Sequence, residues 1–206
     1  MAAPARDLRW VDVGVAGRAL PGQDASGDRE VVRAFPGGVL IGALDGLGHG
    51  DEAADAARRG CTTLERYAGE SVITLVKRSH AELTGSRGVV MSLASLNVID
   101  GTLTWLGVGN VEGVLWQRDG AGRVGRSGLV TRGGVVGAQL PALRAELMTV
   151  SRGDLLVFAT DGIRSDFAEH VALEHSPQEL ADRILARYGR DTDDALVVAA
   201  RFVMEV

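Results

Sequence analysis

The stretch ALDGLGHGDEAADAA, from Ala43 to Ala57, joins an apolar run to an alanine-rich acidic segment through closely spaced glycines. The apolar run predicts a buried strand that ends at Asp45, and the acidic segment predicts a helix from about Glu52 to Tyr67. The carboxylate between them has two interpretations. It is either an ordinary residue of a strand-to-helix turn or part of a metal or phosphate site. The rest of the sequence is needed to choose.

Composition indicates a soluble globular protein and a single domain over residues 1–206. The chain is 46% hydrophobic and 24% charged, and its net charge of −5 argues against nucleic-acid binding. No apolar run reaches the ~18 residues of a membrane span, and the N-terminal residues lack the apolar core of a secretion signal. The single cysteine, Cys61, excludes an internal disulfide and fits a reducing cytoplasm, where we expect it to be a small core residue.

Hydrophobic patterning along the chain predicts strands, then helices, then strands again. Because helices do not alternate with strands, the pattern favours an α+β layered sandwich over a doubly wound sheet. A helix over Pro177–Tyr188 has a clear start signal in Ser176 and Glu179. The other expected elements are a strand over Leu8–Ala16, a hairpin of Val31–Phe35 and Val39–Leu44, helices over Glu52–Tyr67 and Glu70–Leu83, β-type runs from Gly88, and strands over Glu146–Val150, Asp154–Thr160 and Ala195–Val203.

Aspartates stand at the ends of several predicted strands. They are Asp24, Asp45, Asp161, Asp193 and Asp194. Any one of them alone is most simply a turn residue, but carboxylates that converge on one edge repel each other unless a cation neutralises them. Oxygen ligands without a Cys or His cluster suit Mg²⁺ or Mn²⁺, so the set as a whole favours a two-metal site.

Other phosphate chemistries fit the residues less well. A cysteine phosphatase needs a different spacing from that of Cys61 and Arg66, which also fall inside a predicted helix. The DTDD of residues 191–194 precedes a strand, whereas an aspartyl-phosphate nucleophile would follow one. The histidines lack the HExxH spacing of a zinc hydrolase, and GLGHG matches no nucleotide-binding loop.

A series of motifs, in order along nearly the whole chain, carries a family resemblance. The motifs are GQDAS, ALDGLGHG, SRGVVMSLASL, LGVGNV, TRGGVVG, GDLLVFATDGI and DTDDALVV. With them the sequence resembles the metal-dependent serine/threonine phosphatases of the PPM class, in their SpoIIE-type bacterial branch, and within it the small stand-alone phosphatases of stressosome signalling. The resemblance implies a four-layer α-β-β-α sandwich with two antiparallel sheets.

The resemblance also implies roles for individual residues. Asp45 would bridge two Mn²⁺ or Mg²⁺ ions, with the Gly46 carbonyl as a further ligand. Asp161 and Asp193 would hold one ion, and Asp24 would support the second site, partly through water. Asp45, Asp161 and Asp193 are therefore the expected catalytic residues.

Some positions depart from the family pattern or keep two interpretations. Asp194 stands where relatives have Asn or Asp, Leu196 replaces a usual Thr, and Val89 and Val90 replace small or hydroxyl residues. His49 is either a proton donor or phosphate contact, or only a residue at a helix entry. The remaining expectations are Asp51 as the helix N-cap, and Arg18, Arg87 and Arg132 as either phosphoserine contacts or surface residues.

The implied activity is hydrolysis of phosphoserine or phosphothreonine by a hydroxide that the two ions activate. The resemblance implies that the substrates are phosphorylated STAS-domain proteins of a stressosome, dephosphorylated as negative feedback. From the net charge and the lack of a long apolar run we expect no nucleic-acid or membrane partner. One alternative is a SpoIIE-type phosphatase of an anti-sigma factor antagonist. Another is a binding module that keeps the fold without activity.

Overall fold

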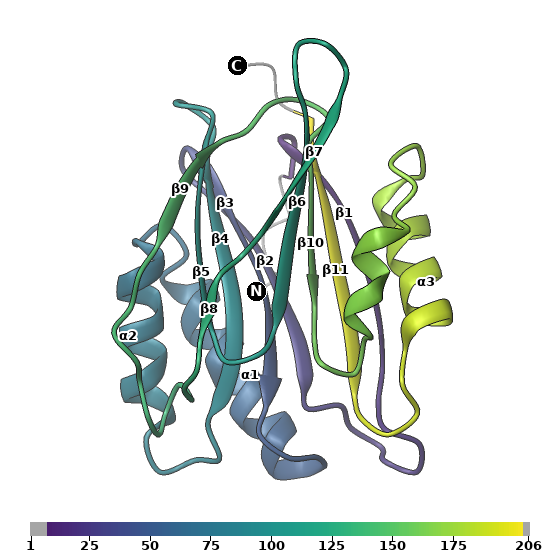
Figure 1. Ribbon diagram of the computed structural model, residues 1–206. Coiled ribbons are helices and arrows are strands. Elements are labelled where there is room, and N and C mark those ends of the chain that lie inside the picture. The colour runs from purple at the N-terminus through teal and green to yellow at the C-terminus, as the bar shows by residue number, and fades with distance from the viewer. Residues whose placement is uncertain (1–7, 204–206) are drawn as a thin grey trace.

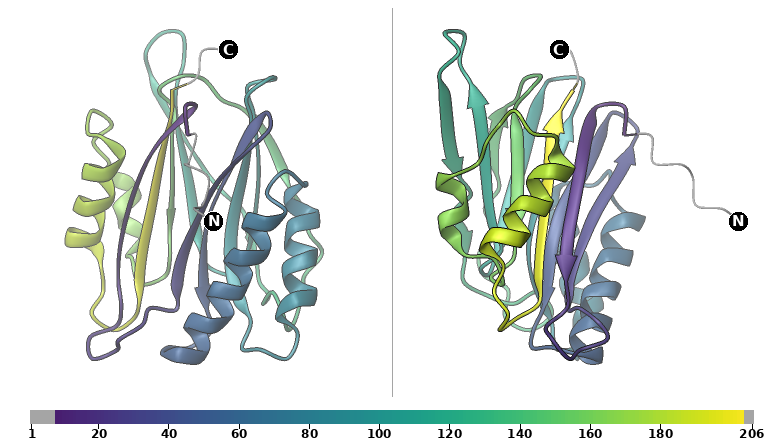
Figure 2. Two further views of the ribbon diagram at one scale, coloured as in Figure 1. Left: turned by 180° about the vertical axis from the view of Figure 1, so that it is seen from behind. Right: turned by 90° about the vertical axis from the view of Figure 1, so that its right-hand side faces the viewer.

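Two sheets stack face to face and carry helices on both outer surfaces (Figures 1 and 2). The computed structural model describes residues 8–203, so residues 1–7 and 204–206 of the domain expected over 1–206 lie outside the described part. The expected α+β fold, a four-layer α-β-β-α sandwich, is confirmed.

The first sheet has five strands, and every neighbouring pair is antiparallel. Val11 lies opposite Phe202, so the first strand of the chain pairs with the last. Because β10 and β11 are antiparallel neighbours, the end of β10 lies beside the start of β11, at the lower edge of the sandwich in Figure 1. In spatial order the sheet contains β1 (Val11–Arg18), β11 (Ala195–Phe202), β10 (Leu155–Ala159), β6 (Glu112–Arg118) and β7 (Val124–Gly128).

The second sheet contains the predicted hairpin, with Phe35 opposite Gly38 across the turn. Its pairs are antiparallel except for the short contact between β5 and β8, which is parallel. The strands in spatial order are β2 (Asp28–Phe35), β3 (Gly38–Gly46), β4 (Val89–Asn97), β5 (Thr102–Val108) and β8 (Thr131–Arg132), and β9 (Glu146–Thr149) pairs with β5.

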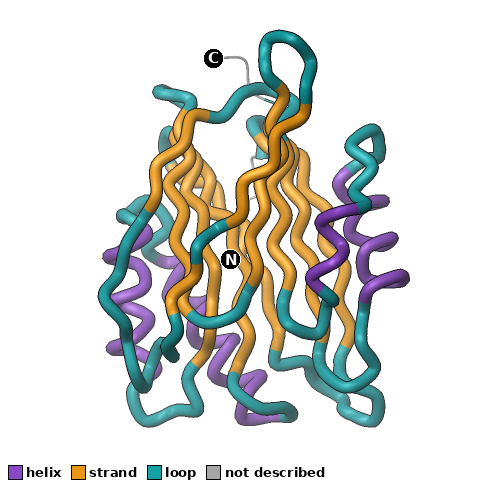
Figure 3. Tube along the Cα trace, viewed as in Figure 1, coloured by secondary structure: helices purple, strands orange, loops and turns teal. Residues whose placement is uncertain are grey.

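Helices cover the outer face of each sheet, as the purple segments of Figure 3 show. Helices α1 (Asp51–Arg66) and α2 (Val72–Leu83) pack on the second sheet. Helix α3 (Pro177–Tyr188) and the short 3₁₀ helix η1 (Ser165–Glu169) pack on the first. No helix in the described part of the chain is long and apolar enough to cross a membrane.

Strand β3 explains why this sequence forms layers. Its side chains alternate between two cores: Val39, Ile41 and Ala43 face the other sheet, whereas Leu40 and Leu44 face the helices. A strand buried on both faces needs an unbroken apolar run instead of an alternating one. The run before Asp45 meets that need, and it carries the carboxylate to the end of a central strand.

The starts of two helices test the capping expectations. Helix α3 begins at Pro177 with Ser176 as N-cap and a capping box to Glu179, as predicted. The expectation that Asp51 caps α1 is wrong, because Asp51 is the first helical residue and Gly50 is the N-cap. Gly50 has a φ of 77°, a conformation that glycine adopts without a steric penalty.

The first turn of α3 sits directly on β1. A Cβ atom on Gly14 would lie 2.2 Å from the backbone of Pro177 and Gln178. The Gln178 side chain accepts a hydrogen bond from the Val15 backbone N–H at 3.1 Å and donates one to the Val15 carbonyl at 2.9 Å. The helix therefore depends on a glycine for its close approach to the strand.

We expect Gly14→Ala to lower the free energy of unfolding by roughly 1–3 kcal/mol, because the added methyl group must displace α3 from β1. Urea denaturation followed by circular dichroism measures this change. The matched control is Gly128→Ala in β7, where an added Cβ would meet nothing within 4 Å. Equal stability of the two variants would contradict this account of the α3 packing.

Candidate active site

The predicted catalytic aspartates meet at one edge of the sandwich. The end of β3, the end of β10 and the start of β11 all reach this edge (Figure 1). A surface pocket of about 570 Å³ opens there and is lined by Asp45, Asp161 and Asp193, with His49 and Asn110 beside them. The structure thus brings together three residues that are far apart in the sequence.

Asp45 has the most strongly perturbed surroundings of these three. Its pKa is raised to about 7, mainly by burial and also by the negative charges of Asp161, Asp193 and Asp194. Within residues 8–203, no hydrogen-bond donor or basic side chain contacts the Asp45 carboxylate. Its charge is therefore opposed by its neighbours and uncompensated by the protein.

Asp161 and Asp193 have partial support from the protein. The Asn110 side chain donates a hydrogen bond to Oδ2 of Asp161 at 2.7 Å, which orients that carboxylate. Oδ1 of Asp193 accepts a bond from the Asp194 backbone N–H at 2.9 Å. Burial and the charge of Asp161 nevertheless raise the pKa of Asp193, while His49 acts in the opposite direction.

Asp28 is a member of this cluster that the sequence analysis missed. It lies directly opposite Asp45 in the β2–β3 ladder and is buried. Burial, followed by the charge of Asp45, raises its pKa to about 8, although the Thr160 hydroxyl donates a hydrogen bond to it at 2.6 Å. Extending the predicted hairpin register back from its turn would have placed Asp28 beside Asp45.

Asp24 lies elsewhere, on the loop between β1 and β2. Its side chain is exposed, and it neither lines the pocket nor contributes to the raised pKa of Asp45. Asp194 is buried and has a structural role, because its two oxygens accept hydrogen bonds from the backbone N–H groups of Leu20 and Gly27, each at 2.7 Å. Asp194 therefore ties the loop that precedes Asp28 to the start of β11.

The glycine after Asp45 has a packing role. A Cβ atom on Gly46 would lie 2.2 Å from the Ala53 carbonyl oxygen, so the missing side chain lets α1 approach the end of β3. The Gly46 backbone N–H donates to the Gly27 carbonyl at 3.1 Å. Whether the Gly46 carbonyl binds a metal ion stays a prediction.

Cationic side chains near the pocket differ in their availability. Arg18 forms an ion pair with Asp191, and Arg87 forms one with Glu52. Arg132 makes no side-chain hydrogen bond or ion pair within the described residues, and the next residue in the chain lines the pocket. Of the three arginines considered from the sequence, Arg132 is the one without an ion-pair partner among residues 8–203.

Cys61 is excluded as a nucleophile by its environment. Its side chain is buried in the core beneath α1, where burial raises the thiol pKa to about 12. A thiol with so high a pKa is protonated at neutral pH and does not react as a thiolate. The expectation of a small core residue is confirmed.

The donor set fits a hard divalent cation. The groups that converge are carboxylates, with a single histidine, His49, and no cysteine lining the same pocket, and carboxylate oxygens suit Mg²⁺ and Mn²⁺. A cation would also relieve the repulsion that raises the pKa of Asp45 and Asp193. In the described part of the chain, no group of three or more His, Cys, Asp or Glu side chains is arranged so that it could hold a metal ion by itself.

Sequence comparison places the chain among known proteins. A family model described as stage II sporulation protein E (SpoIIE) matches residues 36–203. The phosphoserine phosphatase RsbX of Bacillus subtilis (strain 168) is 23% identical over 164 residues, which cover 79% of this chain and 80% of RsbX.

Solved structures show the same fold. A chain from a structure described as "The bacterial stressosome: a modular system that has been adapted to control secondary messenger signaling" is 28% identical, with a TM-score of 0.83 over 93% of this chain and 99% of that one. RsbX in complex with magnesium is 21% identical, with a TM-score of 0.81 over 94% of this chain and 96% of RsbX. A chain that contains the PP2C phosphatase domain and a fragment of the regulatory domain of SpoIIE from Bacillus subtilis is 22% identical, with a TM-score of 0.75 over 95% of this chain and 64% of that one. The chain therefore belongs to the SpoIIE family and is a PPM-class phosphatase.

Proposed function

We propose that this chain is a cytoplasmic serine/threonine phosphatase that removes phosphate from STAS-domain proteins of a stressosome, as negative feedback in stress signalling. The observation that carries the proposal is the cluster of Asp45, Asp161 and Asp193, which lines a pocket and in which burial and mutual repulsion raise the pKa of Asp45 and Asp193. We also propose that residues 1–206 form one phosphatase domain and that its cofactor is a pair of Mn²⁺ or Mg²⁺ ions.

The residues of the pocket would have separate roles in metal binding and catalysis. Asp45, the Gly46 carbonyl, Asp161 and Asp193 would hold the ions, which supply a water whose pKa is lowered to near neutrality. Asn110 orients Asp161 through its hydrogen bond of 2.7 Å. The exposed His49 lines the same pocket and would contact a phosphate or donate a proton to the leaving oxygen.

The partner class rests on the relatives. RsbX is named a phosphoserine phosphatase, and the 28% identical structure is described as that of a stressosome. The net charge of −5 argues against a nucleic-acid substrate. One alternative is that the substrates are phosphorylated antagonists of anti-sigma factors. The other is that the chain is a binding module that keeps the phosphatase fold without catalytic activity.

Phosphate release from a phosphorylated STAS-domain protein tests the proposal. We expect release with Mn²⁺ or Mg²⁺ and none with a chelator. Asp45→Asn should lower the rate by about a hundredfold or more, because it removes the central carboxylate of the cluster. Hydrolysis of p-nitrophenyl phosphate provides a second readout that does not depend on the partner protein.

The matched control is Asp12→Asn, which changes an exposed strand aspartate outside the pocket and should leave both rates unchanged. Activity that survives the chelator or Asp45→Asn would refute the metal mechanism. Hydrolysis of the small substrate alone would refute the partner class, and no hydrolysis of either would support the binding module.

Asp28 and Asp24 can be compared directly as contributors to metal binding. We expect Asp28→Asn to weaken Mn²⁺ binding by roughly tenfold or more, because it removes a buried carboxylate beside Asp45. Asp24→Asn should have a smaller effect, since Asp24 is exposed on the loop. Calorimetric titration with Mn²⁺ measures both variants, and a larger loss in Asp24→Asn would make the loop aspartate the ligand.

The metal-free protein should lose stability as the pH rises. The pKa values of Asp45 and Asp28 are raised to about 7 and about 8, whereas an aspartate in the unfolded chain titrates near about 4. Between these values the folded protein keeps protons that the unfolded chain has released, so the free energy of unfolding falls with increasing pH.

Urea denaturation in a chelator therefore should give a lower midpoint at pH 8 than at pH 5. The double variant Asp28→Asn/Asp45→Asn, which lacks both groups, should show a smaller decrease than the natural protein. An equal decrease in both proteins would assign the pH dependence to other residues.

A further inference from the structure

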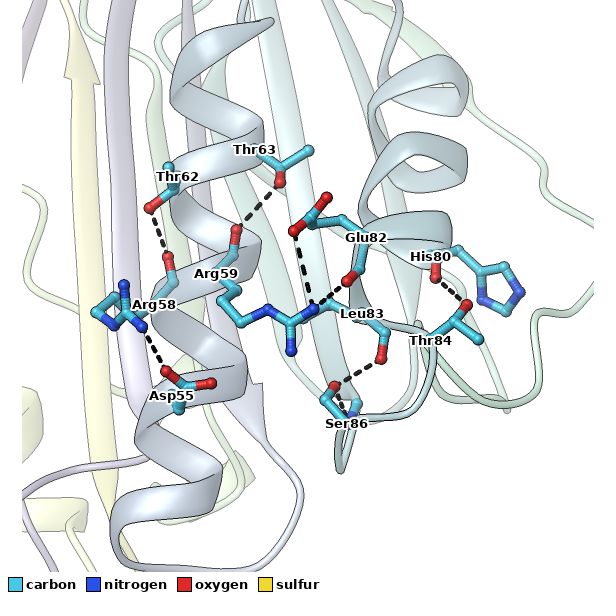
Figure 4. Close-up of polar contacts among 11 residues, drawn as sticks. Asp55, Arg58, Arg59, Thr62, Thr63, His80, Glu82, Leu83, Thr84 and Ser86 are labelled. Carbon is cyan, nitrogen blue, oxygen red and sulfur yellow. Dashed lines mark hydrogen bonds and ion pairs between the residues drawn. The ribbon is translucent and has the colours of Figure 1, made fainter.

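A groove lined by arginines lies between α1 and α2, on the outer face of the helical layer. It encloses about 450 Å³, and Arg58, Arg59, Arg66 and Arg78 line it; we call it the arginine groove. No residue that lines this groove also lines the pocket at the carboxylate cluster. Figure 4 shows one end of the groove, where the Arg59 side chain reaches from α1 to the end of α2.

Two arginines lie against the ring of Tyr67 at the other end of the groove. The guanidinium carbon of Arg78 is 4.2 Å from the ring centroid, and that of Arg66 is 5.4 Å from it. Arg78 also donates from Nε and Nη2 to the two carboxylate oxygens of Glu70, at 2.6 and 2.8 Å. Arg66 makes no ion pair with any described residue, so its charge faces the groove without a counter-charge.

The arginines at the end shown in Figure 4 are held by contacts that leave donors free. Arg59 donates from Nη2 to the Glu82 backbone carbonyl, and the Glu82 carboxylate lies 3.8 Å away. Arg58 pairs with Asp55, one turn earlier on α1. Each contact uses only part of the guanidinium N–H fork, so the side chains are positioned in advance while other N–H groups stay available.

The charge of the groove is opposite to that of the chain as a whole. Four arginines line it together with the carboxylate of Glu82. Asp55, Glu82 and Glu70 pair with Arg58, Arg59 and Arg78, which leaves the positive charge of Arg66 in excess among these residues, whereas the chain carries a net charge of −5. An anionic group is therefore attracted at this place and repelled by much of the remaining surface. A nucleic acid needs a longer basic surface than this, so a short anionic segment of protein fits better.

The length of the groove sets the size of that segment. Arg58 and Arg66 are separated by about 12 Å along α1, because a helix rises about 1.5 Å per residue. An extended peptide covers this distance with roughly four residues. Acidic side chains on alternate residues of such a segment point the same way and can meet both ends of the groove.

We propose that the arginine groove is a docking site for a short acidic segment of a partner protein. The segment lies extended between α1 and α2, with its carboxylates on the guanidinium groups of Arg58, Arg66 and Arg78. The site is separate from the carboxylate cluster, so it holds a partner without obstructing the pocket there. Its occupancy does not depend on the phosphatase function proposed above.

Fluorescence anisotropy with a labelled peptide of alternating glutamate and glycine tests the docking site. We expect the full chain to bind this peptide at low ionic strength and to release it at about 0.5 M salt, where the Debye length is short. The variant Arg58→Glu/Arg66→Glu should weaken binding roughly tenfold or more, because it reverses two charges that each contribute a few-fold.

A matched control exists on the opposite face of the molecule. Arg187 lies in the last turn of α3, with its guanidinium 5.3 Å from the Tyr188 ring, just as Arg66 lies in the last turn of α1 near Tyr67. Arg187→Glu should bind the peptide within about twofold of the natural chain. Both variants should keep the circular dichroism spectrum and the Mn²⁺-dependent hydrolysis of p-nitrophenyl phosphate.

Three outcomes would overturn the proposal. They are equal binding by the Arg58→Glu/Arg66→Glu and Arg187→Glu variants, equal binding of a glutamine–glycine peptide, and stronger binding of a single-stranded oligonucleotide that displaces the acidic peptide. A chain that binds the peptide but hydrolyses no p-nitrophenyl phosphate would refute the phosphatase proposal and leave the docking site standing. The two proposals therefore fail separately.

Discussion

Carboxylates held side by side at the edge of two packed sheets constrain the rest of this fold. Asp28 and Asp45 face each other across the β2–β3 ladder, and burial opposes the charge of both. Such an arrangement persists only if the strand register cannot slip, because a shift of one residue turns every side chain to the opposite face. Gly42 adds a restraint, since a side chain moved into its place would lie 2.5 Å from Leu93. The apolar packing of β3 thus holds in place charges that repel each other.

The loop between β1 and β2 extends this constraint to both ends of the chain. Asp194, at the start of β11, accepts hydrogen bonds from Leu20 and Gly27, and Asp28 follows Gly27 directly. The Thr160 hydroxyl donates to Asp28 at 2.6 Å and accepts from the Leu196 backbone N–H at 2.9 Å. The early loop, β10 and β11 are therefore joined by hydrogen bonds behind the pocket. Asp194 is an aspartate at a site edge whose role is to hold that edge together.

Local signals in the sequence predict many of the helices and strands, whereas contacts between residues far apart in the chain are harder to predict. Helix α3 begins at the predicted residue because a capping box depends on neighbours a few positions apart. The place of Asp28 depends on a strand register, and the role of Asp194 depends on partners more than 160 residues away. The parallel contact of β8 likewise joins segments that no local pattern relates. The sequence thus identifies the cluster through Asp45, Asp161 and Asp193, while its supporting residues require the three-dimensional fold.

Helix α1 connects the carboxylate cluster with the arginine groove. Asp51 and Glu52 lie in its first turn and Arg66 in its last, which is the order that a helix dipole favours. The dipole accounts for Arg66 alone and cannot explain Arg58 and Arg59, which lie in the middle of α1. Surface arginines that served only solubility would not need to converge with Arg78 of another helix on one groove. This convergence, in a chain of net charge −5, is what distinguishes a binding surface from a helix with ordinary end charges.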